Sequence, residues 1–238
     1  MLDKLLGENP NRIAIIRYHG TGSSDPFWIA DSLEIRQRRN YYGVIGVPMF
    51  FFNGTYSTIY LPGEEEPFSQ VQINHPVDPA YFESYQYSPV QILLDAQYDS
   101  ITRQGKITAS ILSEGDLSGM DLKLHCALTE SDLYYEYYSR KLWNHQVLRK
   151  MIPDHLGAPI SLQRMEDNAV VSLDFTLDTS WVEENCEIVA FVQDDKSKKI
   201  LQGGKIHFPV NKPFLVIKDF YLNPDGFLDP GENTNLIL

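Results

Sequence analysis

Apolar and polar residues change their spacing near residue 88 of this 238-residue chain. Before that position, short apolar runs alternate with segments of helical spacing, whereas residues 88–208 carry apolar side chains at every second position along several segments. A period of two is typical of half-buried strands, and strands without helical crossovers between them favour an antiparallel sheet. The sequence therefore predicts an α+β, multidomain chain whose second domain is an antiparallel β-sandwich of immunoglobulin type.

The alternating segments define the strands expected in the second domain. They are 90–98, 107–111, 122–128, 171–177 and 186–192, with a turn at 194–199 and a returning strand at 200–208. Residues 133–160 interrupt the alternation, and a connection of this length usually has its own packing or a role. We interpret its tyrosine-rich run, 134–138, as edge-strand packing, with an aromatic binding face as the alternative.

Helical and strand patterns alternate in residues 1–87. The expected elements are a helix end over 1–9, a strand over 12–19, a helix from Asp25 to Arg39, a strand either side of a turn at Asn53-Gly54, and a helix over 78–87. Asp25 suits the N-cap of its helix, and Pro26 suits the first helical position. The Asn-Gly pair is a strong signal for a tight hairpin.

Composition and charge argue against several classes of function. Hydrophobic residues make up 43% and charged residues 22% of the chain, values that are typical of a globular protein. The chain has 20 Lys and Arg residues and 32 Asp and Glu residues, which gives a net charge of −12, and no cluster of basic residues compensates for this acidity. We therefore expect no nucleic-acid partner. The apolar runs are too short for a transmembrane segment, and the N-terminus has no signal-peptide pattern.

Two cysteines, Cys126 and Cys186, are the only thiols. Their spacing fits neither a zinc site nor a Cys-x-x-Cys redox pair. Either they form one disulfide or both stay free and buried. The second interpretation is favoured, because each lies on an alternating strand and faces the same side as its apolar neighbours.

No catalytic grouping of histidine with serine or aspartate is evident in the sequence. We expect the following histidines to be solvated or hydrogen-bonded structural residues: His19, His125, His145 and His155. His125 is expected on the outer face of its strand.

Residues 209–238 are expected to form a linker and the start of a third, truncated β module. The acidic stretch within it contains a weak calcium candidate, whose oxygen ligands would come from Asn223, Asp225, Asp229 and Glu232. Tyr221 stands where an EF-hand needs a carboxylate, and Pro230 obstructs the exiting helix. A simple turn between strands is therefore favoured over a looser calcium loop, and no other cofactor is indicated.

The order of elements in residues 1–87 resembles the thioredoxin fold from its second strand onward, which implies a cis-proline at Pro48. Followed by a β-sandwich, it resembles the bacterial family named for outer membrane protein 28. The segments that carry the resemblance are 18–20, 25–27, 144–151, 157–160, 175–181 and 185–195. The resemblance implies three parts: an incomplete thioredoxin-like domain over 1–87, the sandwich over 88–208 with its insertion at 133–160, and the module over 209–238.

The first strand and the Cys-x-x-Cys helix start of a thioredoxin-like domain are absent from the sequence. We expect the neighbours of that strand to find partners in the sandwich, in a second copy or in preceding residues. The absence of a catalytic grouping, together with this order of modules, predicts a non-catalytic, extracytoplasmic scaffold or interaction protein with a redox-inactive thioredoxin-like domain. The alternative is a fragment of a thiol–disulfide oxidoreductase whose Cys-x-x-Cys lies upstream of Met1.

The resemblance also implies a location in the periplasm, in the outer membrane or outside the cell. The expected partners are another protein or a second copy of the chain. Peripheral or anchored association with a membrane surface is compatible with the absence of a transmembrane segment.

Overall fold

A computed structural model describes residues 13–20, 25–47, 49–59, 88–137 and 140–208 of the chain. The helices expected over 1–9 and 78–87 and the module expected over 209–238 lie outside these residues. Within the described part of the chain, no helix is long and apolar enough to cross a membrane.

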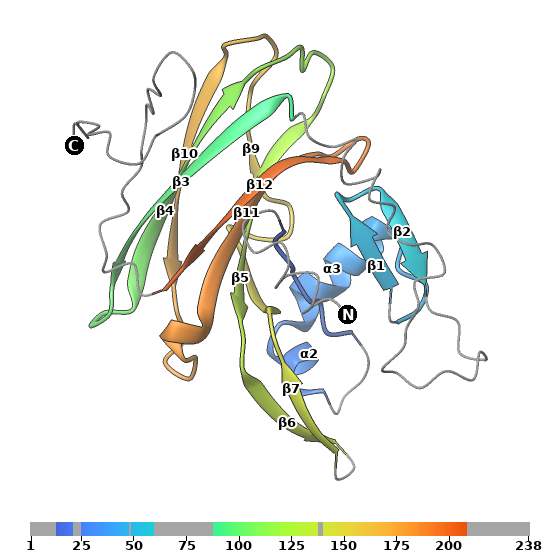
Figure 1. Ribbon diagram of the computed structural model, residues 1–238, viewed down its shortest axis with the longest axis vertical. Coiled ribbons are helices and arrows are strands. Elements are labelled where there is room, and N and C mark those ends of the chain that lie inside the picture. The colour runs from blue at the N-terminus through green and yellow to red at the C-terminus, as the bar shows by residue number, and fades with distance from the viewer. Residues whose placement is uncertain (1–12, 21–24, 48, 60–87, 138–139, 209–238) are drawn as a thin grey trace, which may run out of the picture.

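Two antiparallel sheets pack face to face and form the β-sandwich (Figure 1). The three-stranded sheet has the order β10 (Asn168–Thr176), β4 (Gln104–Ser113) and β3 (Val90–Asp99). The five-stranded sheet has the order β12 (Ile200–His207), β11 (Cys186–Asp194), β5 (Leu122–Glu130) and β8 (Val147–Ile152), with the short β9 (Ala158–Pro159) also paired to β5. The predicted antiparallel β architecture is confirmed, and the immunoglobulin type stays a prediction.

Alternate residues of both sheets meet in one apolar core. Ile107 and Ile111 of β4 and Leu124 and Ile188 of the opposite sheet are at most 1% exposed. Because successive side chains of a strand point to opposite faces, the alternation in the sequence is what supplies this inner layer. Removing this apolar surface from water is the main favourable contribution to folding of the sandwich.

Residues 133–160, expected as an insertion with its own packing or a role, divide into two parts within the described residues. They form a hairpin of β6 (Leu133–Tyr137) and β7 (Arg140–Asn144), followed by β8 and β9. Strand β8 joins the five-stranded sheet by pairing with β5, and it buries residues on both of its faces. This double burial removes the simple alternation, so the sequence pattern hides a strand that belongs to the sheet.

The helix expected from Asp25 to Arg39 is two helices, α2 (Pro26–Ala30) and α3 (Ser32–Tyr42), which we call the helical unit. The predicted N-cap is confirmed, because the Asp25 side chain accepts hydrogen bonds from the amides of Phe27 and Trp28. Asp31 breaks the helix with φ −145° and ψ 46°. Gly43 ends α3 in the left-handed conformation at φ 71°, which favours glycine.

A separate two-stranded hairpin follows the helical unit and confirms the Asn-Gly prediction. Strands β1 (Met49–Phe52) and β2 (Tyr56–Ile59) are antiparallel, and the turn residues Asn53 and Gly54 have positive φ. The turn contacts the segment that joins β11 to β12. The amide of Ile200, the first residue of β12, donates a hydrogen bond to the Asn53 carbonyl at 2.8 Å. A Cβ on Gly54 would lie 1.9 Å from the Lys198 carbonyl oxygen, so this close approach requires glycine.

The strand predicted at 12–19 is not formed within the described residues 13–20, apart from one bridge. Among the described residues, this segment makes one parallel bridge, between Arg17 and Val147 of β8, and it has no ladder with β1. The amide of Arg17 donates to the Gln146 carbonyl at 2.8 Å, and its carbonyl accepts from Leu148 at 3.0 Å. The sandwich therefore supplies the backbone partners of this segment, and the thioredoxin-like arrangement stays a prediction.

Candidate functional site

The helical unit lies on the outer face of the five-stranded sheet, where a strand would normally meet water (Figure 1). Ile35 of α3, Ala127 of β5, and Leu148 and Met151 of β8 form a second apolar cluster there, and each is at most 1% exposed. Helix α3 therefore has its own apolar contact with the sandwich. This contact positions the polar side chains of the interface.

Arg38 of α3 is a charged residue buried inside this interface, with 2% exposure. Its guanidinium donates to the Tyr42 hydroxyl at 2.7 Å and to Oε1 of Gln193 on β11 at 3.1 Å. The ring centroids of Tyr41 and Tyr42 each lie 4.8 Å from its central carbon. Cation–π contacts and hydrogen bonds thus offset part of the desolvation cost of the charge. No carboxylate of the described residues forms an ion pair with it.

Gln193 completes this network from the sheet side. Its side-chain amide donates to the Tyr42 hydroxyl at 3.0 Å and to the Lys198 carbonyl at 2.6 Å, while its oxygen accepts from Arg38. A fully buried glutamine with all of these bonds specifies one docking of the helix on the sheet, since any shift would leave buried polar groups unpaired.

His125 lies on the outer face of β5, as predicted, but the expectation that it is solvated or hydrogen-bonded is wrong. The side chain is 0% exposed, and neither ring nitrogen has a hydrogen-bond partner within the described structure. Its ring stacks on Phe191 at 5.1 Å and is covered by Gly157, where a Cβ would come within 2.7 Å. Burial, together with the positive charge of Arg38, lowers the pKa of His125 to about 3, so it is neutral near pH 7.

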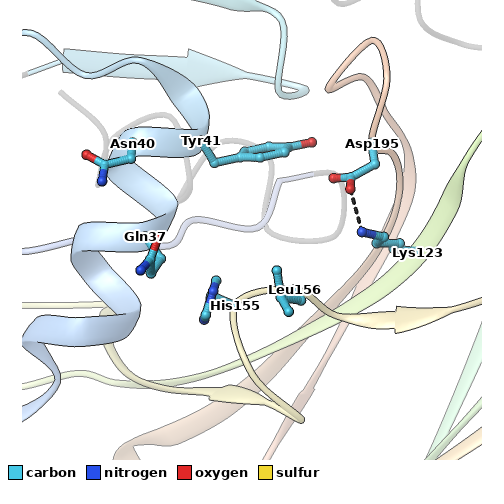
Figure 2. A pocket seen from close by; sticks show the side chains of 7 residues that line it. All are labelled: Gln37, Asn40, Tyr41, Lys123, His155, Leu156 and Asp195. Carbon is cyan, nitrogen blue, oxygen red and sulfur yellow. Dashed lines mark hydrogen bonds and ion pairs between the residues drawn. The ribbon is translucent and has the colours of Figure 1, made fainter.

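A small cavity opens beside this interface (Figure 2). It has a volume of about 200 Å³ and is lined by Gln37, Asn40 and Tyr41 of α3, Lys123 of β5, His155 and Leu156 of the loop after β8, and Asp195 of the turn after β11. Ligand pockets for drug-sized molecules are usually about 300–1,000 Å³. The cavity is therefore too small for such a ligand and suits water or a small ion.

Lys123 and Asp195 form an ion pair at one side of the cavity (Figure 2). Although burial acts to raise the pKa of Asp195, its contact with the Lys123 ammonium contributes to a net lowering. Burial and the neighbouring Asp195 raise the pKa of the Tyr41 hydroxyl, which therefore stays protonated at neutral pH. Across the cavity, Nδ1 of His155 lies 3.3 Å from a Glu34 oxygen. The charged groups around the cavity thus lie in two pairs, Lys123 with Asp195 and His155 with Glu34, and none of them is an activated nucleophile.

Both cysteines point into the sandwich core and are free. Cys126 is 0% and Cys186 is 1% exposed, and burial is the first cause that raises the pKa of each thiol to about 12. Thiol–disulfide exchange requires the thiolate and access to it. The interpretation as two free, buried core thiols is confirmed.

The remaining predicted site residues are dispersed over the described chain or lie outside it. Three of the histidines face carboxylates: His19 contacts Asp25 at 3.0 Å, His145 contacts Asp132 at 3.1 Å, and His155 contacts Glu34. Pro48 and the calcium candidates Asn223, Asp225, Asp229 and Glu232 lie outside the described residues. Within the described chain, no group of three or more His, Cys, Asp or Glu side chains is placed to hold a metal ion.

The two strands β6 and β7, which we call the aromatic hairpin, expose large apolar side chains. Tyr134 is 46% and Trp143 is 61% exposed, and their ring centroids are 5.4 Å apart. On the other face, Tyr135 is half-buried and lies 6.1 Å from Phe27 of α2. Within the described part of the run, Tyr135 packs against the helical unit and Tyr134 is exposed, and the aromatic binding face stays a prediction. The signal that could have identified Trp143 is the alternation of β7, which sequence reasoning did not use.

A family model matches the sequence, and the chain is similar to solved structures. The model of the family "Outer membrane protein Omp28" matches residues 35–212. The solved structure of HBP35 of Porphyromonas gingivalis is similar at a TM-score of 0.62 and 12% identity, covering 84% of this chain and 66% of that one. A domain of the outer membrane lipoprotein Omp28 from the same organism matches at a TM-score of 0.36 and 20% identity, covering 50% of this chain and 95% of that one. No curated protein matches the sequence.

Proposed function

Since the chain belongs to the Omp28 family of outer membrane proteins, we propose that it is a non-catalytic scaffold or interaction protein of the cell envelope. The protein is extracytoplasmic and associated with the outer membrane. The chain spans 66% of the length of HBP35, so the role of any longer protein is part of the proposal. We extend the proposal to an immunoglobulin-type sandwich and a thioredoxin-like front domain that does not catalyse redox chemistry.

The observation that carries the proposal is the exposed face of the aromatic hairpin. Tyr134 and Trp143 present two adjoining exposed aromatic rings on a strand pair, and tyrosine and tryptophan are enriched at interaction sites. The helical unit supports the other face of the hairpin through Phe27 and Tyr135. The Arg38 interface holds α3 of that unit on the sandwich, so the hairpin contacts an element that is itself packed on the five-stranded sheet.

The burial of both thiols supports the redox-inactive part of the proposal. Neither Cys126 nor Cys186 is positioned to attack a disulfide, because each is enclosed in the core and protonated at neutral pH. We expect the 238-residue chain to give no reduction of insulin above the uncatalysed rate with dithiothreitol. The matched control is the Cys126→Ala/Cys186→Ala protein. Turnover by the wild-type chain that disappears in this control would contradict the proposal.

The interaction role is tested by photocrosslinking in intact cell envelopes. A photoreactive phenylalanine analogue replaces Tyr134 in one variant and Ser172, an exposed residue of β10, in the control. We expect adducts with an envelope component from position 134 and a much weaker signal from position 172. Equal labelling from both positions, or none from position 134, would count against a contact surface on the hairpin.

A further inference from the structure

The open face of the aromatic hairpin carries a defined set of side chains. The register pairs Tyr134 with Trp143 and Glu136 with Lys141, and these four residues lie on the same face because they alternate along each strand. All four are exposed. The face therefore combines an aromatic pair with one ammonium and one carboxylate.

The hairpin extends away from the sandwich (Figure 1). Each strand has five residues, which corresponds to a length of about 17 Å at the usual rise per residue. That length is about twice the screening length of charges at physiological salt. Glu136 and Lys141, in the outer half of the hairpin, are thus largely screened from the acidic body of the protein, whereas Tyr134 and Trp143 lie in the inner half.

The hairpin also differs from the rest of the chain in charge. Its strands contain Arg140 and Lys141 against the single acid Glu136, whereas the whole chain has a net charge of −12. The open face itself carries Lys141 and Glu136, so it is neutral on a strongly acidic protein. An anionic surface therefore repels this face less than it repels the acidic body of the protein.

We propose that the open face of the aromatic hairpin docks on the anionic lipid surface of the outer membrane. The inference rests on the proposed function and names the partner of its contact surface. Tyrosine and tryptophan favour the boundary between lipid headgroups and acyl chains, because their rings are apolar and their O–H and N–H groups remain hydrated. Lys141, on the same face, pairs with lipid phosphate, and Glu136 opposes the contact.

A lipid surface suits this face better than a protein partner because of its location and shape. The protein is associated with the outer membrane, so a bilayer surface is near it. Tyr134 and Trp143 meet edge to face at 62° and form no pocket, whereas the contact sites of protein partners are centred on well-packed pockets. A shallow aromatic face with a flanking cation fits the disordered headgroup layer.

Vesicle co-sedimentation tests the proposal with the full 238-residue chain. The probes are vesicles of phosphatidylethanolamine and phosphatidylglycerol at 3:1, and vesicles of phosphatidylcholine alone. We expect binding to the first and weak binding to the second. Trp143→Ser should weaken binding about tenfold. Lys141→Gln should weaken it, and Glu136→Gln strengthen it, each by about fivefold at low salt, and both effects should fade at 0.5 M salt.

Two matched controls separate the hairpin from exposed residues elsewhere. Val170→Ser removes an apolar side chain that is 66% exposed on β10, and Lys106→Gln removes an exposed ammonium on β4; neither should change binding. The Glu136 and Lys141 variants are surface substitutions, so the test stands even if Trp143→Ser fails to fold. Absence of binding to the anionic vesicles, or unchanged binding of all hairpin variants, would overturn the lipid inference. Protein adducts from position 134 without vesicle binding would overturn it while leaving the proposed function intact.

Discussion

The two sheets of the sandwich have similar inner faces and different outer faces. In the three-stranded sheet the outer residues meet solvent, as Leu93 at 45% and Val170 at 66% exposure show. In the five-stranded sheet, every residue of β11 is buried, and so are eight of the nine residues of β5. The difference arises because the helical unit and its neighbouring loops cover the second sheet and leave the first one open.

On the covered face of the five-stranded sheet, polar residues that the alternating pattern would place in solvent are buried. His125, Gln193 and Thr129 occupy outward positions and are all at most 1% exposed. Gln193 gains the hydrogen bonds of the Arg38 network, whereas His125 and the Thr129 hydroxyl have none among the described residues. The interface is therefore specified at a few polar points, and its stability depends on them unequally.

The largest expected effect comes from Arg38. Arg38→Ala leaves the side-chain oxygen of Gln193 without its donor, removes one of the two donors to the Tyr42 hydroxyl and opens a cavity beneath α3. We therefore expect a loss of about 3 kcal/mol in the free energy of unfolding. Urea denaturation followed by circular dichroism measures it. The control, Arg36→Ala, changes an exposed residue of the same helix and should cost less than about 0.5 kcal/mol. Equal effects of the two variants would show that the interface does not depend on the buried guanidinium.

A matched pair of valines compares the two outer faces directly. Val189 of β11 is 4% exposed and Val170 of β10 is 66% exposed, and both side chains point away from the sandwich core. Val189→Ser should destabilise the protein by about 2 kcal/mol, because it buries a hydroxyl and removes apolar contacts. Val170→Ser should change stability by less than about 0.5 kcal/mol. Thermal unfolding measures both, and similar shifts in Tm would contradict the covering of the five-stranded sheet.

An effect of similar size to that of Val189→Ser, confined to acidic pH, is the pH dependence that His125 adds. Its folded pKa is about 3 and the unfolded pKa is 6.5, so the stability that it contributes is present above pH 6.5 and is lost as the pH falls toward 3. Between pH 7 and pH 5 the unfolded state alone takes up the proton, which costs about 2 kcal/mol of folding stability. His125→Leu removes this dependence. The difference between wild type and variant should be flat from pH 7 to pH 8 and should change by about 2 kcal/mol by pH 5.

A pH-independent difference over the whole range would mean that His125 is solvated in the folded protein. The comparison with the variant matters because other groups titrate in the same range. Asp31, for example, has its pKa raised to about 6, chiefly by burial, and that shift acts in the opposite direction.

Much of the sandwich could be predicted from the sequence. The strands around Ile107, Leu173 and Ile188 and the turn at 194–199 follow from residues that alternate where one face is buried. The N-cap at Asp25 and the turn at Asn53-Gly54 follow from local backbone chemistry. These features depend on neighbours along the chain, so a single sequence contains their signal.

The candidate site was far less accessible to prediction. In the sequence, Arg38 is one of several basic residues in the last turns of a helix. The residues next to it along the chain do not distinguish it from Arg36, which is exposed. Strand β8 was hidden because its residues are buried on both faces, and the strand predicted at 12–19 makes one bridge to β8 within the described residues. Each of these depends on contacts between distant parts of the chain.

The sequence by itself determined the antiparallel strands, the inward side of the two thiols and the local caps and turns, because those depend on periodicity and backbone preference. Only the tertiary structure decided which outer face is covered, that Arg38 and His125 are buried there, and that Tyr134 and Trp143 remain open on the hairpin. The physical reason is that a side chain's environment is set by whatever packs against it, and the α3 contact joins residues more than 100 positions apart.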